Sequence, residues 1–128
     1  MLSMRASVLV VDDDARFRGL AARILTAMEL SVVGQAGTVA EAIEVVAALR
    51  PDAVLLDVGL PDGDGVTLAR YLAGLPWRPR IVLTSSDRDA TTHQDAVDAG
   101  AVGFVPKDDL PDASLHRLLE GDRGLEYG

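Results

Sequence analysis

The chain has 128 residues with 20 acidic and 12 basic side chains, a formal net charge of −8, and no cysteine. This length suits one domain with a single hydrophobic core, and 48% hydrophobic with 25% charged residues is typical of a globular protein. The lack of cysteine excludes disulfides, thiolate metal sites and cysteine nucleophiles. The negative charge and scattered arginines argue against direct nucleic-acid binding. No apolar run reaches the roughly 18 residues of a membrane span, so we expect a cytoplasmic protein without membrane contact.

Apolar runs and helical periodicity alternate along the chain. Short apolar runs predict strands over residues 7–11, 31–37, 53–56, 80–84 and 102–105. Apolar residues at helical spacing predict helices over residues 17–28, 38–49, 66–73, 89–99 and 112–119. Thr38 and Glu41 form a capping box at the start of the second helix. The helix over residues 89–99 has little apolar surface, so we expect it to be loosely held.

Five strands that alternate with five helices predict a doubly wound α/β fold, in which helices cover both faces of a parallel sheet. Ligands bind such sheets beyond the carboxyl ends of the strands. The residues to interpret are therefore the polar ones at the predicted strand ends, Asp12, Asp13, Asp57, Thr84 and Lys107.

Asp57 stands where the central apolar run stops, directly before the turn-forming residues 59–65. A single carboxylate held at the end of a buried strand and facing a loop is a candidate site. Taken alone, Asp57 could equally be a polar residue that ends a strand.

The chain resembles the receiver domains of two-component response regulators from Arg5 to about Leu119. Four motifs in order carry the resemblance: Val-Val-Asp-Asp after the first strand, Leu-Leu-Asp-Val-Gly-Leu-Pro-Asp-Gly-Asp-Gly around Asp57, Leu-Thr-Ser after the fourth strand, and Gly-Phe-Val-Pro-Lys at the fifth. The resemblance implies a flavodoxin-like, three-layer fold with strand order 2-1-3-4-5. Residues 1–121 would form the receiver domain, and residues 122–128 a flexible tail.

The resemblance also implies that a histidine kinase or phosphotransfer protein phosphorylates Asp57. Asp12, Asp13 and Asp57, with the backbone carbonyl of Gly59, would hold Mg²⁺ or Mn²⁺. Elementary electrostatics favours the same cation, because three converging carboxylates repel one another and resist ionisation. A hard divalent ion with oxygen ligands removes that conflict.

Lys107 and Thr84 would contact the phosphoryl oxygens, and Thr84 with Phe104 would form the conformational switch. Phe104 stands where many family members have tyrosine, and Asp108 follows Lys107 where many have proline. The Pro-Lys-Asp order is similar to receivers of the LuxR/NarL type. The partners expected on this basis are the kinase, a second copy of the chain, and an output domain or effector protein.

Two other functions compete with this interpretation. Phosphatases of the haloacid-dehalogenase type place a second aspartate two residues after the nucleophile, where this chain has Gly59. A receiver-like domain that binds partners without phosphorylation is the other alternative, and the intact set of Asp13, Asp57, Thr84 and Lys107 argues against it. We therefore predict a phosphorylation-controlled signalling module rather than a turnover enzyme.

Overall fold

The computed structural model describes residues 5–111 and 113–121, so the predicted tail at residues 122–128 lies outside the described part. The strands of the main sheet are β1 (Ser7–Val11), β2 (Ser31–Ala36), β3 (Ala53–Asp57), β6 (Arg80–Ser85) and β7 (Gly103–Pro106). The helices are α1 (Ala15–Ala27), α2 (Val39–Leu49), α3 (Gly65–Ala73), α4 (His93–Asp98) and α5 (Ala113–Glu120). A 3-10 turn, η1, covers Lys107–Asp109.

The five strands form one parallel sheet with the order β2-β1-β3-β6-β7, which confirms the predicted order 2-1-3-4-5. Strand β3 is central, and all five of its residues are buried, as its unbroken apolar sequence requires. The register places Asp57 of β3 beside Thr84 of β6, and Thr84 beside Val105 of β7. The carboxyl ends of these strands therefore lie at one edge of the sheet.

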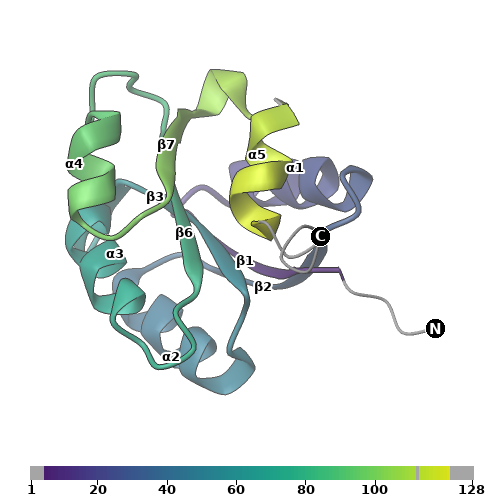
Figure 1. Ribbon diagram of the computed structural model, residues 1–128, viewed down its shortest axis with the longest axis horizontal. Coiled ribbons are helices and arrows are strands. Elements are labelled where there is room, and N and C mark those ends of the chain that lie inside the picture. Colours follow the sequence, from purple (N-terminus) through teal and green to yellow (C-terminus); the bar gives the residue numbers. More distant parts are fainter. Residues whose placement is uncertain (1–4, 112, 122–128) are drawn as a thin grey trace.

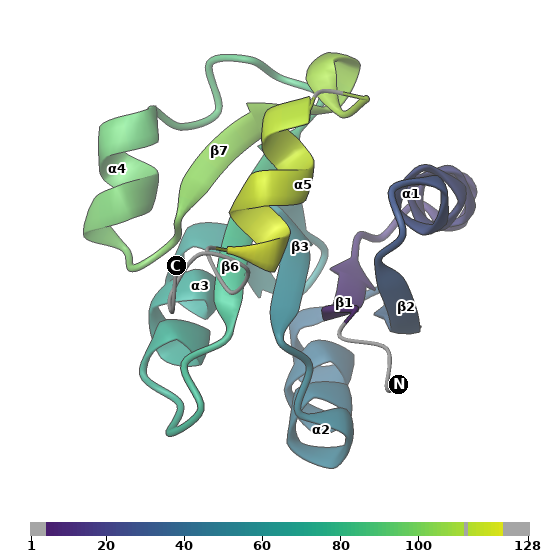
Figure 2. The same ribbon diagram turned by 45° about the vertical axis from the view of Figure 1, so that its right-hand side comes forward.

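Helices cover both faces of the sheet, as the alternating pattern predicts (Figures 1 and 2). One buried cluster joins the sheet to α2, α3 and α4 through side chains such as Val46, Leu72 and Ala96. A second cluster joins the opposite face to α1 and α5 through side chains such as Leu25 and Leu115. The fold is the predicted three-layer α/β/α arrangement.

Helix α4 is shorter than the sequence predicts. The prediction of a helix over residues 89–99 is wrong at its start, because α4 begins at His93. The Thr92 side chain accepts a hydrogen bond from Asp95 N at 3.0 Å and sets that start, while Asp89 N is held in a turn by Asp87 Oδ1 at 2.9 Å. Within α4 only Ala96 is buried, which agrees with the expected weak packing.

The loop after β3 contains a small hairpin that the sequence pattern does not predict. Strands β4 (Gly59–Leu60) and β5 (Gly63–Asp64) pair in antiparallel fashion and lead directly into α3. Within the described residues, no helix is long and apolar enough to cross a membrane.

Candidate functional site

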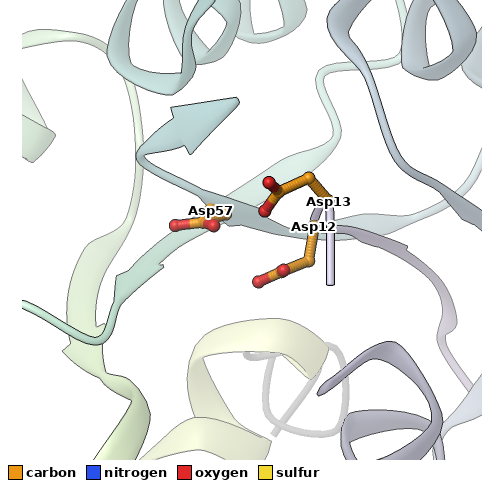
Figure 3. Close-up of side chains that lie close together, drawn as sticks. All are labelled: Asp12, Asp13 and Asp57. Atoms are coloured by element: carbon orange, nitrogen blue, oxygen red, sulfur yellow. The ribbon is translucent and has the colours of Figure 1, made fainter. Parts of the chain in front are cut away.

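Three carboxylates meet at the carboxyl edge of the sheet. Asp12 and Asp13 follow β1, and Asp57 ends the neighbouring strand β3. Each offers an oxygen within 4.8 Å of the oxygens of the other two (Figure 3). Asp12 and Asp57 are buried and Asp13 is exposed. The structure thus brings together the three acids that the sequence predicts to share a site.

Lys107 supplies the positive charge of this cluster. Its Nζ lies 2.7 Å from Asp12 Oδ2 and 3.7 Å from Asp57 Oδ2. Asp12 Oδ1 accepts a hydrogen bond from Asp14 N at 2.8 Å, whereas Asp12 Oδ2 has no hydrogen-bond partner of suitable geometry among the described residues. The ammonium group is therefore the counter-charge of a fully buried carboxylate.

The pKa of Asp57 is raised from its ordinary value of 3.8 to about 6. Burial is the main cause, and the negative charge of Asp12 is the second. Lys107 and the Gly59 amide, which donates to Asp57 Oδ1 at 3.3 Å, offset part of this effect. One ammonium group thus does not fully compensate the converging carboxylates, and an oxygen-binding divalent cation fits the site.

Thr84 contributes a buried hydroxyl beside Asp57. Directly paired residues of neighbouring strands project to the same face of a sheet, so the side chains of Thr84 and Asp57 lie on one face. Thr84 Oγ1 is buried and has no hydrogen-bond partner among the described residues. Among the described residues this hydroxyl is thus a donor without an acceptor. An unsatisfied buried hydroxyl of this kind costs roughly 1–3 kcal/mol.

Two glycines shape the loop around Asp57. An added Cβ at Gly65 would collide with the backbone oxygen of Asp57, and Gly65 N donates to Val58 O at 2.6 Å. Glycine at this position therefore allows α3 to start directly against the end of β3. Gly59 is exposed, and an added Cβ would meet no atom within 4 Å, so that side of the site is open.

Phe104, the predicted switch residue, lies in β7 and is partly buried against the cluster on the α2, α3 and α4 face. It neighbours Leu83 in β6, one residue before Thr84. The structure thus places Phe104 and Thr84 on adjacent strands, while their coupling stays a prediction.

Sequence reasoning missed two residues that support the site. Lys107 Nζ lies 4.1 Å from the centroid of the Phe17 ring, which therefore supports the ammonium group from α1. Arg18 Nη1 donates to the backbone oxygen of Asp12 at 2.6 Å and fixes the loop that carries the two acids. Phe17 follows the helical spacing of core residues, so no sequence signal pointed to its contact with Lys107. Arg18 lies in the first turn of α1, close in sequence to Asp12, and that position was the available signal for its contact.

The family model of the response regulator receiver domain matches residues 8–119. The chain is 46% identical over 101 residues to the DNA-binding transcriptional activator DevR/DosR of Mycobacterium tuberculosis, covering 78% of this chain and 46% of that protein. It is 38% identical over 106 residues to a protein-glutamate methylesterase/protein-glutamine glutaminase of Photobacterium profundum, covering 81% of this chain and 27% of that enzyme. The chain thus spans half or less of these relatives.

Two solved receiver domains are similar to this chain over nearly their whole length. The BeF3-activated N-terminal receiver domain of Klebsiella pneumoniae RstA has 37% identity and a TM-score of 0.74, with 88% of this chain and 94% of that chain covered. The signal receiver domain of the putative response regulator NarL from Mycobacterium tuberculosis has 30% identity to this chain and a TM-score of 0.76, and the match covers 91% of this chain and 98% of that chain.

Proposed function

Because this chain belongs to the response regulator receiver domain family, we propose that Asp57 accepts a phosphoryl group from a histidine kinase or phosphotransfer protein. The observation that carries the proposal is the set of groups around Asp57. Two further carboxylates, the Lys107 ammonium group and the Thr84 hydroxyl converge on one open edge of the sheet. This hydroxyl has no hydrogen-bond partner within the described part of the chain.

The Asp57 carboxylate is the nucleophile of the proposed reaction. One of its oxygens attacks phosphorus and forms an acyl phosphate, while the bond from phosphorus to the donor's histidine nitrogen breaks. The electron pair stays on that nitrogen, which takes a proton from solvent. Since the pKa of Asp57 is about 6, most of the carboxylate is ionised and reactive at neutral pH.

Lys107 and Thr84 would bind the oxygens of the transferred group. Lys107 Nζ already lies 3.7 Å from Asp57 Oδ2, so an oxygen attached beyond that atom enters its reach. The Thr84 hydroxyl would gain an acceptor, which residues 5–111 and 113–121 do not supply in the unmodified protein. Positioning and charge neutralisation of this kind account for most of the catalysis of phosphoryl transfer.

Asp12, Asp13, Asp57 and the Gly59 carbonyl would hold Mg²⁺ or Mn²⁺, ions that prefer oxygen ligands. When bound, the cation neutralises the charge that collects on the phosphoryl oxygens and the carboxylates. Two observations support a fit between these residues and a cation: the raised pKa of Asp57, and the fact that Lys107 is the one ion-pair partner of Asp12 among the residues that the structure describes.

The proposed output is a changed binding surface rather than a released product. Thr84 and Phe104 would transmit the change from Asp57 to β7 and to α4, which holds one buried residue, Ala96. The altered surface would bind a second copy of the chain, an output domain or an effector protein. We place these events in the cytoplasm, where a kinase has access to ATP.

Incubation with acetyl phosphate and Mg²⁺, followed by intact-mass measurement, tests the proposal. We expect one added phosphoryl group on the wild type and on Glu44→Gln, an exposed control on α2, and none on Asp57→Asn. Labelling of Asp57→Asn to the wild-type extent would refute the assignment. A wild type that stays unlabelled would favour a phosphorylation-independent module, and continuous phosphate release from many substrates would favour a phosphatase.

A further inference from the structure

Asp62 connects the hairpin after Asp57 to the first turn of α2. Its Oδ1 accepts a hydrogen bond from Val39 N at 2.7 Å, and its Oδ2 accepts one from Ala40 N at 3.1 Å. These amides belong to the first turn of α2 and have no partner inside the helix. The two hydrogen bonds lower the pKa of Asp62, so the carboxylate is ionised at neutral pH and faces the positive end of the helix dipole.

The same helix end already has its own cap. Thr38 Oγ1 accepts a hydrogen bond from Glu41 N at 3.0 Å, and Glu41 Oε1 accepts one from Gly37 N at 2.6 Å. These contacts are local in sequence, whereas Asp62 is 23 residues from Val39. Asp62 therefore adds a long-range connection that local capping of α2 does not require.

The hairpin that carries Asp62 has little structure of its own. Its strands β4 and β5 are two residues each, with Gly59 opposite Asp64. A hairpin of this size is not stable in isolation, so its orientation depends on contacts with other elements. One such contact is close, because an added Cβ at Gly63 would lie 3.0 Å from Val39 Cγ2. The bidentate Asp62 carboxylate then fixes the turn of the hairpin on α2.

We propose that Asp62 is a positioning residue that holds the Gly59 carbonyl in place for the cation of the acidic site. The inference rests on the proposed function, in which this carbonyl is a metal ligand. Gly59 is exposed and meets no neighbour on its Cβ side, so packing there does not fix it. Its amide donates a long hydrogen bond of 3.3 Å to Asp57 Oδ1, so the position of its carbonyl also depends on the pairing of Gly59 with Asp64 and on the Asp62 contact with α2.

The test compares Asp62→Ala with Thr38→Ala, which removes a cap from the same helix end without touching the hairpin. Mg²⁺ binding without phosphoryl donor is measured by calorimetry on the full chain. We expect Asp62→Ala to weaken Mg²⁺ binding by about tenfold, the lower end of the effect of groups that orient metal ligands. Thr38→Ala should keep the wild-type affinity, and Asp62→Asn, which retains one acceptor oxygen, should lie between wild type and Asp62→Ala.

Wild-type affinity in Asp62→Ala would overturn the inference, and so would an equal loss in Thr38→Ala, because the effect would then follow the helix end alone. A second readout needs no metal: the Gly59 amide should exchange with solvent faster in Asp62→Ala than in Thr38→Ala, and equal rates contradict the inference. If the wild type binds no Mg²⁺, the metal part of the proposed function fails, while amide exchange still decides whether Asp62 orders the hairpin. Asp62→Asn supports both measurements if Asp62→Ala does not fold.

Discussion

Asp57→Asn should stabilise the folded protein in buffer that contains no divalent cation. Burial of the wild-type carboxylate and, second, the negative charge of Asp12 raise its pKa from 3.8 to about 6. Asparagine has nearly the same shape and keeps an oxygen for the hydrogen bond that Gly59 N donates at 3.3 Å. It carries no charge, so the repulsion from Asp12 and the cost of burying a carboxylate both disappear.

The sign and size of the effect follow from the pKa shift. Below pH 3.8 the Asp57 carboxyl is protonated in both the folded and the unfolded chain, so the substitution changes little. Between pH 3.8 and about 6 the unfolded chain ionises first, so the folded state loses stability as pH rises. At about 1.4 kcal/mol per pH unit, the loss is at most about 3 kcal/mol. Water screens charges at the open edge of the site, so we expect about 1–2 kcal/mol.

Urea unfolding at a series of pH values measures this free energy directly. At pH 7.5 with a chelator, Asp57→Asn should unfold at higher urea than the wild type, and the difference should vanish near pH 3.5. Glu44→Gln removes one negative charge from an exposed helix face and should match the wild type throughout. Added Mg²⁺ should narrow the difference, because it stabilises the wild type by binding. Equal unfolding free energies of Asp57→Asn and wild type at pH 7.5 would refute the electrostatic argument.

Three further substitutions test other parts of the site. Thr84→Val removes a buried hydroxyl that has no partner among the described residues, so it should raise the unfolding free energy by about 1 kcal/mol in urea titrations while slowing phosphorylation; a loss of stability would mean that the hydroxyl is satisfied. Phe17→Leu removes the ring 4.1 Å from Lys107 Nζ and should slow labelling by acetyl phosphate about two- to fivefold, whereas Phe17→Tyr should not. Gly65→Ala drives a Cβ into the Asp57 backbone oxygen and should lower the unfolding free energy by about 3 kcal/mol; unchanged unfolding would show that α3 shifts freely.

The main elements of the fold were predictable because continuous apolar runs mark the strands and apolar residues at helical spacing mark the helices. The apolar run of β3 is long enough to identify a strand buried on both faces, and Thr38 caps α2 where its position predicts. Helix α4 was predicted too long, because the acids before Thr92 suit a helix start as well as a turn. The β4–β5 hairpin was not predicted, since two-residue strands show no periodicity.

The part of the acidic site that lies at the strand ends was predictable from the sequence. The carboxyl ends of parallel strands share one edge, so Asp12, Asp57 and Lys107 were expected to meet, and the structure places Lys107 Nζ 2.7 Å from Asp12. The contacts of Phe17 and Asp62 were not predictable. Phe17 follows the same helical spacing as core residues, and Asp62 meets α2 only through the tertiary arrangement of the hairpin.

The unmodified site contains one buried polar group that phosphorylation would satisfy, the Thr84 hydroxyl, which has no hydrogen-bond partner among the described residues. An unsatisfied buried hydroxyl costs roughly 1–3 kcal/mol. The acyl phosphate would carry more negative charge than the Asp57 carboxylate, so it would not relieve the repulsion from Asp12. Moving a two-state equilibrium from 1:99 to 99:1 takes about 5.5 kcal/mol. Further burial of Phe104, which is already partly buried, adds less than the roughly 1.5–3 kcal/mol of a fully exposed aromatic side chain. The Thr84 contact would therefore supply part of the proposed switch energy, and the contacts of the phosphoryl oxygens with Lys107 and the cation would have to supply the rest. Helix α4, with Ala96 as its one buried residue, is the element that offers the least resistance to it.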